Sequence, residues 1–189
     1  QIRRGYLRRF HKTIHALDST TIQLVANCMD WAQHRRRKAA AKCHLRLNLQ
    51  TFLPQCAIID TARCHDSRKA YALCAQLQPG EIVVFDKAYL DFAHLSDLGE
   101  RGIHWVSRAK DNLQYRAVEV RGPGSNSRIL RDEIIELRGP ASRQAYPRRL
   151  RRVVALVEVN GQDMEMVFLT NNLEWSAWTV AELYRCRWD

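Results

Sequence analysis

The sequence feature that most constrains the fold is an uninterrupted apolar run, Ile82-Val-Val-Phe85, which follows a Pro79-Gly80 turn and ends at Asp86. Such a run is typical of a central strand that is buried on both faces of a sheet. Residues 66–77 and 91–101 are predicted to be helices, and the first begins at an acidic capping residue. Together with a further strand at residues 103–107, this order of elements predicts an α/β fold.

Three more strands are predicted before this run. Residues 14–22 alternate between polar and apolar side chains and are rich in β-branched residues, which predicts a strand with Asp18 near its end. Residues 42–49 alternate again, and residues 56–60 form a short apolar segment. The basic residues 1–13 show no such pattern and are interpreted as a connection from an upstream region.

The sequence changes character after Lys110. Residues 111–174 contain two strand-like runs, 153–159 and 162–169, on either side of an Asn160-Gly161 turn, and this pattern is a strong hairpin signal. We therefore expect a mostly β segment here. A last helix is predicted to begin with a capping box formed by Thr179-x-x-Glu182.

The positive charge is concentrated in two blocks of a chain whose formal net charge is +10. Residues 1–46 carry eleven Lys and Arg against two Asp, and residues 111–152 carry ten Arg against five acidic residues. This distribution favours a polyanionic partner, of which nucleic acid is the commonest. The run Arg35-Arg36-Arg37-Lys38 is interpreted as a strip that binds the phosphate backbone. A solvated basic surface is the alternative.

The six cysteines include no Cys-x-x-Cys pair, which argues against a zinc site built from clustered thiolates. Most lie in apolar stretches and favour buried, reduced thiols in a cytoplasmic protein. No apolar run approaches the roughly 20 residues that a membrane-spanning helix needs. The sequence therefore predicts a cytoplasmic protein without such a helix.

Asp18 and Asp86 are both predicted at the rim of the sheet, where ligands gather in α/β folds. On neighbouring strands their carboxylates would repel one another, and a divalent cation would remove that repulsion. Mg²⁺ prefers oxygen ligands, and two such ions about 3.5–4 Å apart can activate an attacking oxygen and stabilise a leaving one on phosphorus. The pair therefore points to phosphodiester chemistry. The alternative is that each Asp forms a turn or caps a helix.

The final segment places Tyr184 and Arg187 one helical turn apart, and hence on one helix face. This pair resembles the start of a signature in bacterial insertion-sequence transposases: Tyr, two residues, Arg, three residues, Glu, six residues, Lys. The Glu of that signature would fall two residues after Asp189. We therefore expect the chain to end just before a third acidic residue.

Other local sequences strengthen the resemblance. Leu17-Asp18-Ser19-Thr20 and Asp86-Lys87-Ala88-Tyr89 are similar to segments of DDE transposases of the insertion-sequence-four type, although that family often has Gly where Ala88 stands. His65-Asp66 and Phe168-Leu-Thr-Asn171 are similar to further family segments. The resemblance covers the chain from about residue 14 onwards.

The resemblance implies a fold, an activity and a set of site residues. The fold is a ribonuclease H-like mixed sheet flanked by helices, with a core of residues 14–110 and 175–189 and a β-strand insertion subdomain at residues 111–174. The activity is that of a cut-and-paste DNA transposase, acting on transposon ends and target DNA in the bacterial cytoplasm, at the nucleoid. Relatives usually act as dimers on DNA.

In this family the first two acids, here Asp18 and Asp86, are catalytic and bind two Mg²⁺ ions, for which Mn²⁺ substitutes, together with the third acid. Tyr184 and Arg187 are implied to hold backbone phosphate, since the planar Arg fork pairs with phosphate oxygens. Lys87, beside Asp86, is a further candidate for DNA contact.

Two other interpretations stay open. A nuclease or resolvase on the same core shares the metal chemistry, although the long β insertion favours a transposase. A catalytically inactive, DNA-binding transposase remnant is the other, because two of three metal ligands rarely support in-line chemistry.

Overall fold

The computed structural model describes Leu7 and residues 9–24, 33–34, 38–61, 66–122, 126–159 and 161–188. The strands are β1 (Ile14–Leu24), β2 (Gln33–His34), β3 (Lys38–Asn48), β4 (Leu53–Thr61), β5 (Ile82–Phe85), β6 (His104–Arg108), β7 (Tyr115–Arg121), β8 (Ile129–Leu137), β9 (Leu150–Val159) and β10 (Gln162–Thr170). The helices are α2 (Asp66–Cys74), α3 (Phe92–Glu100), α4 (Pro140–Ala145) and α5 (Ala177–Arg185), with short 3-10 helices η2 (Lys87–Tyr89) and η3 (Cys186–Trp188).

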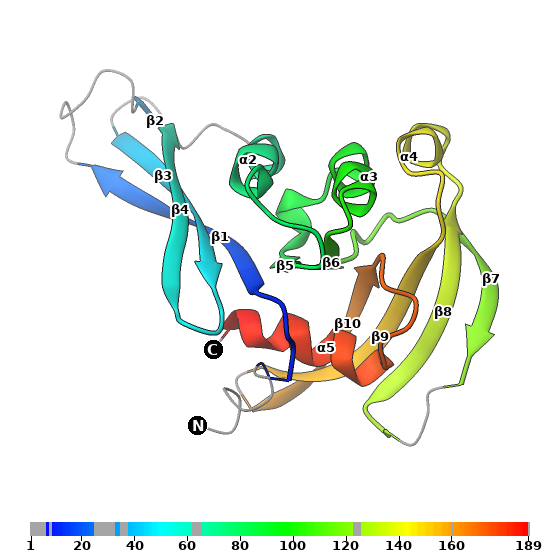
Figure 1. The fold of residues 1–189 in the computed structure, drawn as a ribbon. Helices are drawn as coiled ribbons and strands as arrows, with labels where there is room; N and C mark the ends of the chain where they lie inside the picture. Colours follow the sequence, from blue (N-terminus) through cyan, green and yellow to red (C-terminus); the bar gives the residue numbers. More distant parts are fainter. Residues whose placement is uncertain are drawn as a thin grey trace.

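These strands form one 10-stranded sheet in the order β2-β3-β1-β5-β6-β10-β9-β8-β7, with β4 also paired to β3. Helices α2 and α3 lie on one side of the sheet and α5 lies on the other (Figure 1). The pairings of β5 with β1 and with β6 are parallel, and the other pairings in the described part are antiparallel. The predicted mixed α/β class is confirmed.

The apolar run is the central strand that the sequence predicts. All four residues of β5 are buried, because helices cover both faces of the sheet. Ile82 and Val84 belong to the core that includes the buried face of α5. Val83 and Phe85 belong to the core that includes α2 and α3. This alternation tells us which face of the sheet each neighbouring side chain occupies.

Asp18 does not lie near the end of its strand, so that prediction is wrong. It is the fifth of the 11 residues of β1. The strand continues because β3 pairs with it in antiparallel register from His15↔Asn48 to Leu24↔Ala39. The parallel pairing of β1 with β5, however, ends at Leu17. Asp18 is therefore at an edge of the parallel part of the sheet, within a longer strand.

The strands of the second half extend the same sheet. β10 pairs with β6 in antiparallel register, with Leu169 opposite Ser107. The predicted hairpin is confirmed, since β9 and β10 pair from Gln162↔Val159 onwards and Gly161 has a φ of 77°. A positive φ of this kind is available to Gly at little cost.

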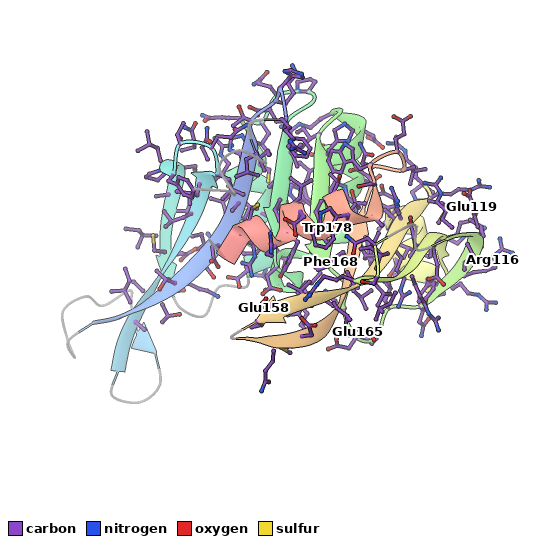
Figure 2. The ribbon with its side chains drawn as sticks, turned by 90° about the horizontal axis from the view of Figure 1, so that it is seen from below. Arg116, Glu119, Glu158, Glu165, Phe168 and Trp178 are labelled. Atoms are coloured by element: carbon purple, nitrogen blue, oxygen red, sulfur yellow. The ribbon has the colours of Figure 1, made fainter. Side chains whose placement is uncertain are left out.

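Helix α5 crosses the sheet over β10, where Phe168 packs against Tyr184 with ring centroids 4.9 Å apart (Figure 2 labels Phe168 and Trp178 in this region). The predicted capping box at Thr179 is wrong. The helix begins at Ala177, and its cap is Ser176, whose side chain accepts a hydrogen bond from the Thr179 backbone N–H at 3.0 Å. Glu182 instead pairs with Arg185 within the helix, at 2.6 Å.

Helix α2 ends at Cys74, short of the predicted 66–77. Two arginines from other elements bind the carbonyl groups that have no partner at this end. Arg46 donates to the Leu73 carbonyl at 2.8 Å. Arg101 donates to the carbonyls of Cys74 and of Ala75 and Leu77 just after the helix, at 3.0–3.1 Å. These contacts supply the positive charge that the last turn of the helix itself lacks.

Within the described ranges, no helix has the length and apolar character needed to cross a membrane. Four of the cysteines lie in these ranges and are free thiols. Cys74 and Cys186 are buried, whereas Cys43 and Cys56 are half-buried. Burial raises the pKa of the Cys74 thiol to about 12, so this thiol is inert at neutral pH.

Candidate active site

The parallel pairing of β1 with β5 brings Asp18 and Asp86 together. The pairing runs from Ile14↔Ile82 to Leu17↔Phe85, so the two Asp are the next residues in register. Successive side chains of a strand point to opposite faces. Because Leu17 and Phe85 both pack toward α2 and α3, Asp18 and Asp86 share the opposite face, the one that α5 covers.

Both carboxylates are held by the backbone of the next residue. The Ser19 backbone N–H donates to Oδ1 of Asp18 at 2.8 Å, and the Lys87 backbone N–H donates to Oδ1 of Asp86 at 2.6 Å. The Asp18 side chain is 63% exposed and that of Asp86 is 32% exposed. The pair is therefore oriented by local hydrogen bonds and open to solvent.

Arg187 lies against both carboxylates. Its Nη1 is 3.5 Å from Oδ1 of Asp18 and its Nη2 is 3.4 Å from Oδ2 of Asp86. The Arg187 side chain is only 2% exposed. The structure thus brings together three of the residues that the sequence singles out, from β1, from the end of β5 and from η3. Arg187 contacts Asp86 across 101 residues of sequence.

Tyr184 contacts this group from the protein core. Its ring is fully buried, its hydroxyl accepts a hydrogen bond from Nη2 of Arg187 at 3.5 Å, and the guanidinium lies 5.3 Å from its ring centroid. Burial raises the pKa of the Tyr184 hydroxyl. In this arrangement Tyr184 supports Arg187 from the core, and its predicted contact with DNA phosphate stays a prediction.

Lys87 lies at the outer edge of the site, where its Nζ pairs with Asp111 at 2.9 Å. The two residues line an open pocket of about 530 Å³ together with Ala88, Lys110 and Asn112. Lys110 donates from Nζ to the Leu90 carbonyl at 3.2 Å. Lys110 was not among the residues that the sequence singled out.

The predicted basic strip is not placed by the structure. Arg35, Arg36 and Arg37 lie outside the described residues, and Lys38 is described only by its backbone, as the first residue of β3. Their contact with DNA stays a prediction.

His44 has a structural environment on the other face of the sheet. It is fully buried, and its Nδ1 lies 3.3 Å from the Tyr89 hydroxyl and 3.5 Å from Oδ1 of Asp66. Burial lowers the pKa of His44. This cluster links β3, η2 and the first turn of α2, and thereby supports the turn that carries Asp86.

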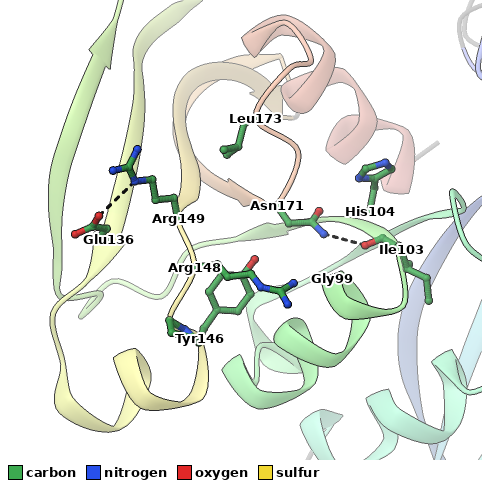
Figure 3. Close-up of a pocket in the computed structure, with 11 residues that line it drawn as sticks. Gly99, Ile103, His104, Glu136, Tyr146, Arg148, Arg149, Asn171 and Leu173 are labelled. Atoms are coloured by element: carbon green, nitrogen blue, oxygen red, sulfur yellow. Dashed lines mark hydrogen bonds and ion pairs between the residues drawn. The ribbon is translucent and has the colours of Figure 1, made fainter.

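A second pocket, of about 590 Å³, lies away from these carboxylates, between α3, α4 and β10 (Figure 3). Two of its polar groups are already engaged. Arg149 pairs with Glu136 at 3.4 Å, and the Asn171 side chain donates to the Ile103 carbonyl at 2.9 Å. None of the residues predicted for the site lines this pocket, so we place the candidate site at the carboxylates.

The donor atoms of Asp18 and Asp86 fit a divalent cation. Hard cations prefer carboxylate oxygens, and one oxygen of each Asp already faces the cationic guanidinium of Arg187. In the described ranges no group of three or more His, Cys, Asp or Glu is arranged to hold a metal ion. The pair therefore offers two ligands of such a site.

A protein-family model described as "Transposase DDE domain" matches residues 9–189. One curated relative, "Probable transposase for insertion sequence element IS5377" from Geobacillus stearothermophilus, is 29% identical over 182 residues, which are 95% of this chain and 46% of the relative. Another, "Putative transposase y4zB" from Sinorhizobium fredii, is 24% identical over 193 residues, covering 100% of this chain and 52% of the relative. The chain thus spans about half the length of the curated relatives it matches.

Among solved structures, the chain is similar to the piggyBac transposase in a synaptic complex with hairpin DNA, with a TM-score of 0.52 at 10% sequence identity. The likeness covers 92% of this chain and 38% of that chain. At this identity it concerns the fold alone.

Proposed function

We propose, because this chain belongs to the transposase DDE domain family, that it is the catalytic part of a DNA transposase that cuts and joins phosphodiesters at transposon ends. Within that family we assign it to the insertion-sequence-four type. We interpret residues 14–110 and 175–189 as a ribonuclease H-like core, and residues 111–174 as its β-strand insertion.

The observation that carries the proposal is the placement of Asp18 and Asp86 one residue beyond the parallel pairing of β1 with β5, with both carboxylates against Arg187. Contacts of 3.5 Å and 3.4 Å between Arg187 and the two carboxylates add little to the stability of the fold, because Asp18 is largely open to water. The arrangement suits a site that takes up an exchangeable cation.

Each residue of the site has a role in this proposal. Asp18 and Asp86 would hold the ions, and the hydrogen bonds from Ser19 and Lys87 fix the orientation of their carboxylates. Two Mg²⁺ ions held there would supply activation of the attacking oxygen and stabilisation of the leaving oxygen. Arg187 carries positive charge beside the two aspartates and is proposed to bind phosphate oxygens of the substrate.

DNA is the proposed partner, and the formal net charge of +10 supports it. Lys87 and Lys110 line the pocket beside Asp86 and are proposed to contact the DNA backbone. Tyr184 is proposed to contribute through Arg187. The strip of Arg35, Arg36, Arg37 and Lys38 is proposed as a further backbone contact, and a dimer on paired ends as the active assembly.

The third acidic ligand is proposed to come from the residues that follow Asp189 in a parent protein. The spacing from Tyr184 and Arg187 supports this, because it places the Glu of the signature on the same helix face. The site described here would then hold two of its three protein ligands.

Calorimetric titration with Mn²⁺ tests the proposal. We expect the wild-type chain to bind Mn²⁺ and the Asp18→Ala/Asp86→Ala double variant to lose that binding. The matched control is Glu158→Ala/Glu165→Ala, which removes the same charge from exposed positions of the β9–β10 hairpin (Figure 2). A chain extended through the expected Glu should bind more tightly and should nick DNA in the presence of Mn²⁺.

Two results would contradict the proposal. Equal Mn²⁺ binding by the wild type and the Asp18→Ala/Asp86→Ala variant would remove the metal site from these residues. An extended chain that binds DNA but neither Mn²⁺ nor Mg²⁺ would instead support the inactive remnant.

A further inference from the structure

One cation of the protein itself already lies between the two carboxylates of the site. Nη1 of Arg187 faces Asp18 and Nη2 faces Asp86, so the guanidinium spans the pair with its two terminal nitrogens. The oxygens it faces, Oδ1 of Asp18 and Oδ2 of Asp86, are atoms that a divalent cation would use. Arg187 and such a cation therefore compete for the same oxygens.

The contacts of Arg187 with these oxygens are long. They measure 3.5 Å and 3.4 Å, whereas well-formed charge-assisted N–H···O contacts are about 2.7–2.9 Å. Each carboxylate also receives a shorter hydrogen bond from the backbone, at 2.8 Å and 2.6 Å. The aspartates are thus fixed by the backbone, and they do not depend on the guanidinium for their orientation.

The two aspartates in turn supply negative charge beside Arg187. Its side chain is 2% exposed, and a buried cation is costly without nearby negative charge. A divalent cation on Asp18 and Asp86 would replace that negative charge with positive charge a few ångströms away. Repulsion would then act on a guanidinium that lies on η3, at the end of the last helix.

We propose that Arg187 is a placeholder cation: it neutralises Asp18 and Asp86 in the metal-free protein and moves away from them when a divalent cation binds. This inference rests on the proposed metal site. It explains why two carboxylates can lie together on one face of a sheet before any ion arrives. It also means that Arg187 weakens the binding of the first ion. An Arg that only oriented the aspartates would not weaken that binding.

The test is calorimetric titration of the full 189-residue chain with Mn²⁺ at low ionic strength. We expect Arg187→Gln to bind Mn²⁺ about tenfold more tightly than the wild type, within the usual range for two coupled sites. Arg185→Gln is the matched control, because it removes the same charge from the preceding turn, where Arg185 pairs with Glu182. The control should bind as the wild type does.

Arg187→Lys separates charge from shape. Lys keeps the positive charge but lacks the fork that faces both carboxylates, so its Mn²⁺ affinity should lie between those of the wild type and Arg187→Gln. Unchanged or weaker Mn²⁺ binding by Arg187→Gln, with binding still abolished in Asp18→Ala/Asp86→Ala, would overturn the placeholder role and leave the proposed function standing. Absence of Mn²⁺ binding in every variant would overturn both.

A second measurement follows Arg187 directly in the wild-type protein. In protein labelled with ¹⁵N-arginine, the Arg187 side-chain resonance is identified by its absence from Arg187→Lys. Addition of Mg²⁺ should shift this resonance and speed its exchange with water, while the resonance of Arg151 should not respond. An Arg187 resonance that stays unchanged while Mg²⁺ binds would contradict the inference.

Discussion

Two arginine–aspartate groups in this protein use the same chemistry in opposite ways. Arg151 donates from Nε and Nη2 to both oxygens of Asp132, at 2.7 Å and 2.6 Å. Arg187 faces two aspartates with single contacts of 3.5 Å and 3.4 Å. Arg151 and Asp132 are 3% and 6% exposed, whereas Asp18 is 63% exposed. The Arg151–Asp132 pair is therefore closed to solvent, whereas the group around Arg187 is open to it.

The surroundings of the two arginines explain the difference. Arg151 also donates to the carbonyls of Leu173 and Trp175, so it joins β8, β9 and the segment that leads into α5. Both charged side chains are also almost completely buried, so solvent ions have little access to them. The carboxylates beside Arg187 keep a face toward water, and an incoming cation can reach them. The comparison teaches that geometry and access, rather than residue type, distinguish a structural ion pair from a site.

The largest effect is expected from breaking the closed pair. Arg151→Met leaves the Asp132 carboxylate buried without its partner, and removal of one partner of a buried pair costs about 3–5 kcal/mol. Urea denaturation should show this loss in the free energy of unfolding. Arg151→Met/Asp132→Leu, which removes both charges, should regain most of it. A single variant as stable as the wild type would show that the pair is not structural.

A smaller effect is expected at a buried polar group, the imidazole of His94. His94 is 1% exposed, and neither of its ring nitrogens has a hydrogen-bond partner among the described residues. Burial lowers the pKa of His94 to about 4. Above about pH 6.5 the ring is neutral in both the folded and the unfolded protein. Below that pH the ring is protonated in the unfolded chain but stays neutral in the folded chain. The free energy of unfolding therefore falls as the pH drops toward 4.

This loss should amount to about 2–3 kcal/mol for the wild type between pH 6.5 and pH 4. His94→Phe keeps an aromatic ring against Tyr71, whose ring centroid is 4.2 Å away, and should lose less stability over the same range. Thermal unfolding at a series of pH values makes the comparison. Identical pH profiles for the two proteins would remove His94 from the account.

The next smaller effect is expected at Arg101, which is half-buried and donates to the carbonyl of Cys74, the last residue of α2, and to those of Ala75 and Leu77 just after it. Arg101→Met keeps much of the side-chain volume and loses these charged donors, so the free energy of unfolding should fall by about 1–2 kcal/mol. Amide hydrogen exchange should then show faster opening at the end of α2 than elsewhere. Protection that falls evenly over the whole chain would contradict a local capping role.

The smallest stability effect is expected at the open group. Asp18→Asn keeps the shape of the side chain and removes one charge from an exposed, weakly held pair, so the free energy of unfolding should change by less than about 1 kcal/mol. Mn²⁺ binding should nevertheless be lost. A variant that unfolds readily would show that Asp18 serves the fold, in the way that Asp132 does.

Local sequence patterns predicted the elements that depend on local chemistry. The buried run of β5, the capped helix α3 and the Asn160-Gly161 hairpin all lie where the pattern placed them, because apolar runs, caps and turn residues act over a few positions. The predicted start of α5 at Thr179 was wrong, because the helix is capped by Ser176. Both residues are good caps, and only packing selects between them.

The site itself needed pairing information that a single sequence does not contain. Asp18 was predicted at a strand end because the long partner β3 could not be foreseen from residues 14–22. The contacts of Arg187 depend on the register of β1 with β5 and on how α5 crosses the sheet. The two aspartates were singled out by their predicted places at the rim of the sheet and by resemblance, and the structure shows that they share a face. Lys110 was missed because its partner, the Leu90 carbonyl, belongs to another loop.

The central claim is that Asp18 and Asp86 together bind a divalent metal ion. The most direct measurement is the anomalous difference density of crystals soaked in Mn²⁺. The account predicts a peak within coordination distance of both carboxylates, with the Arg187 guanidinium moved away from them. A peak elsewhere, or no peak while Arg187 keeps its contacts with both aspartates, would contradict it.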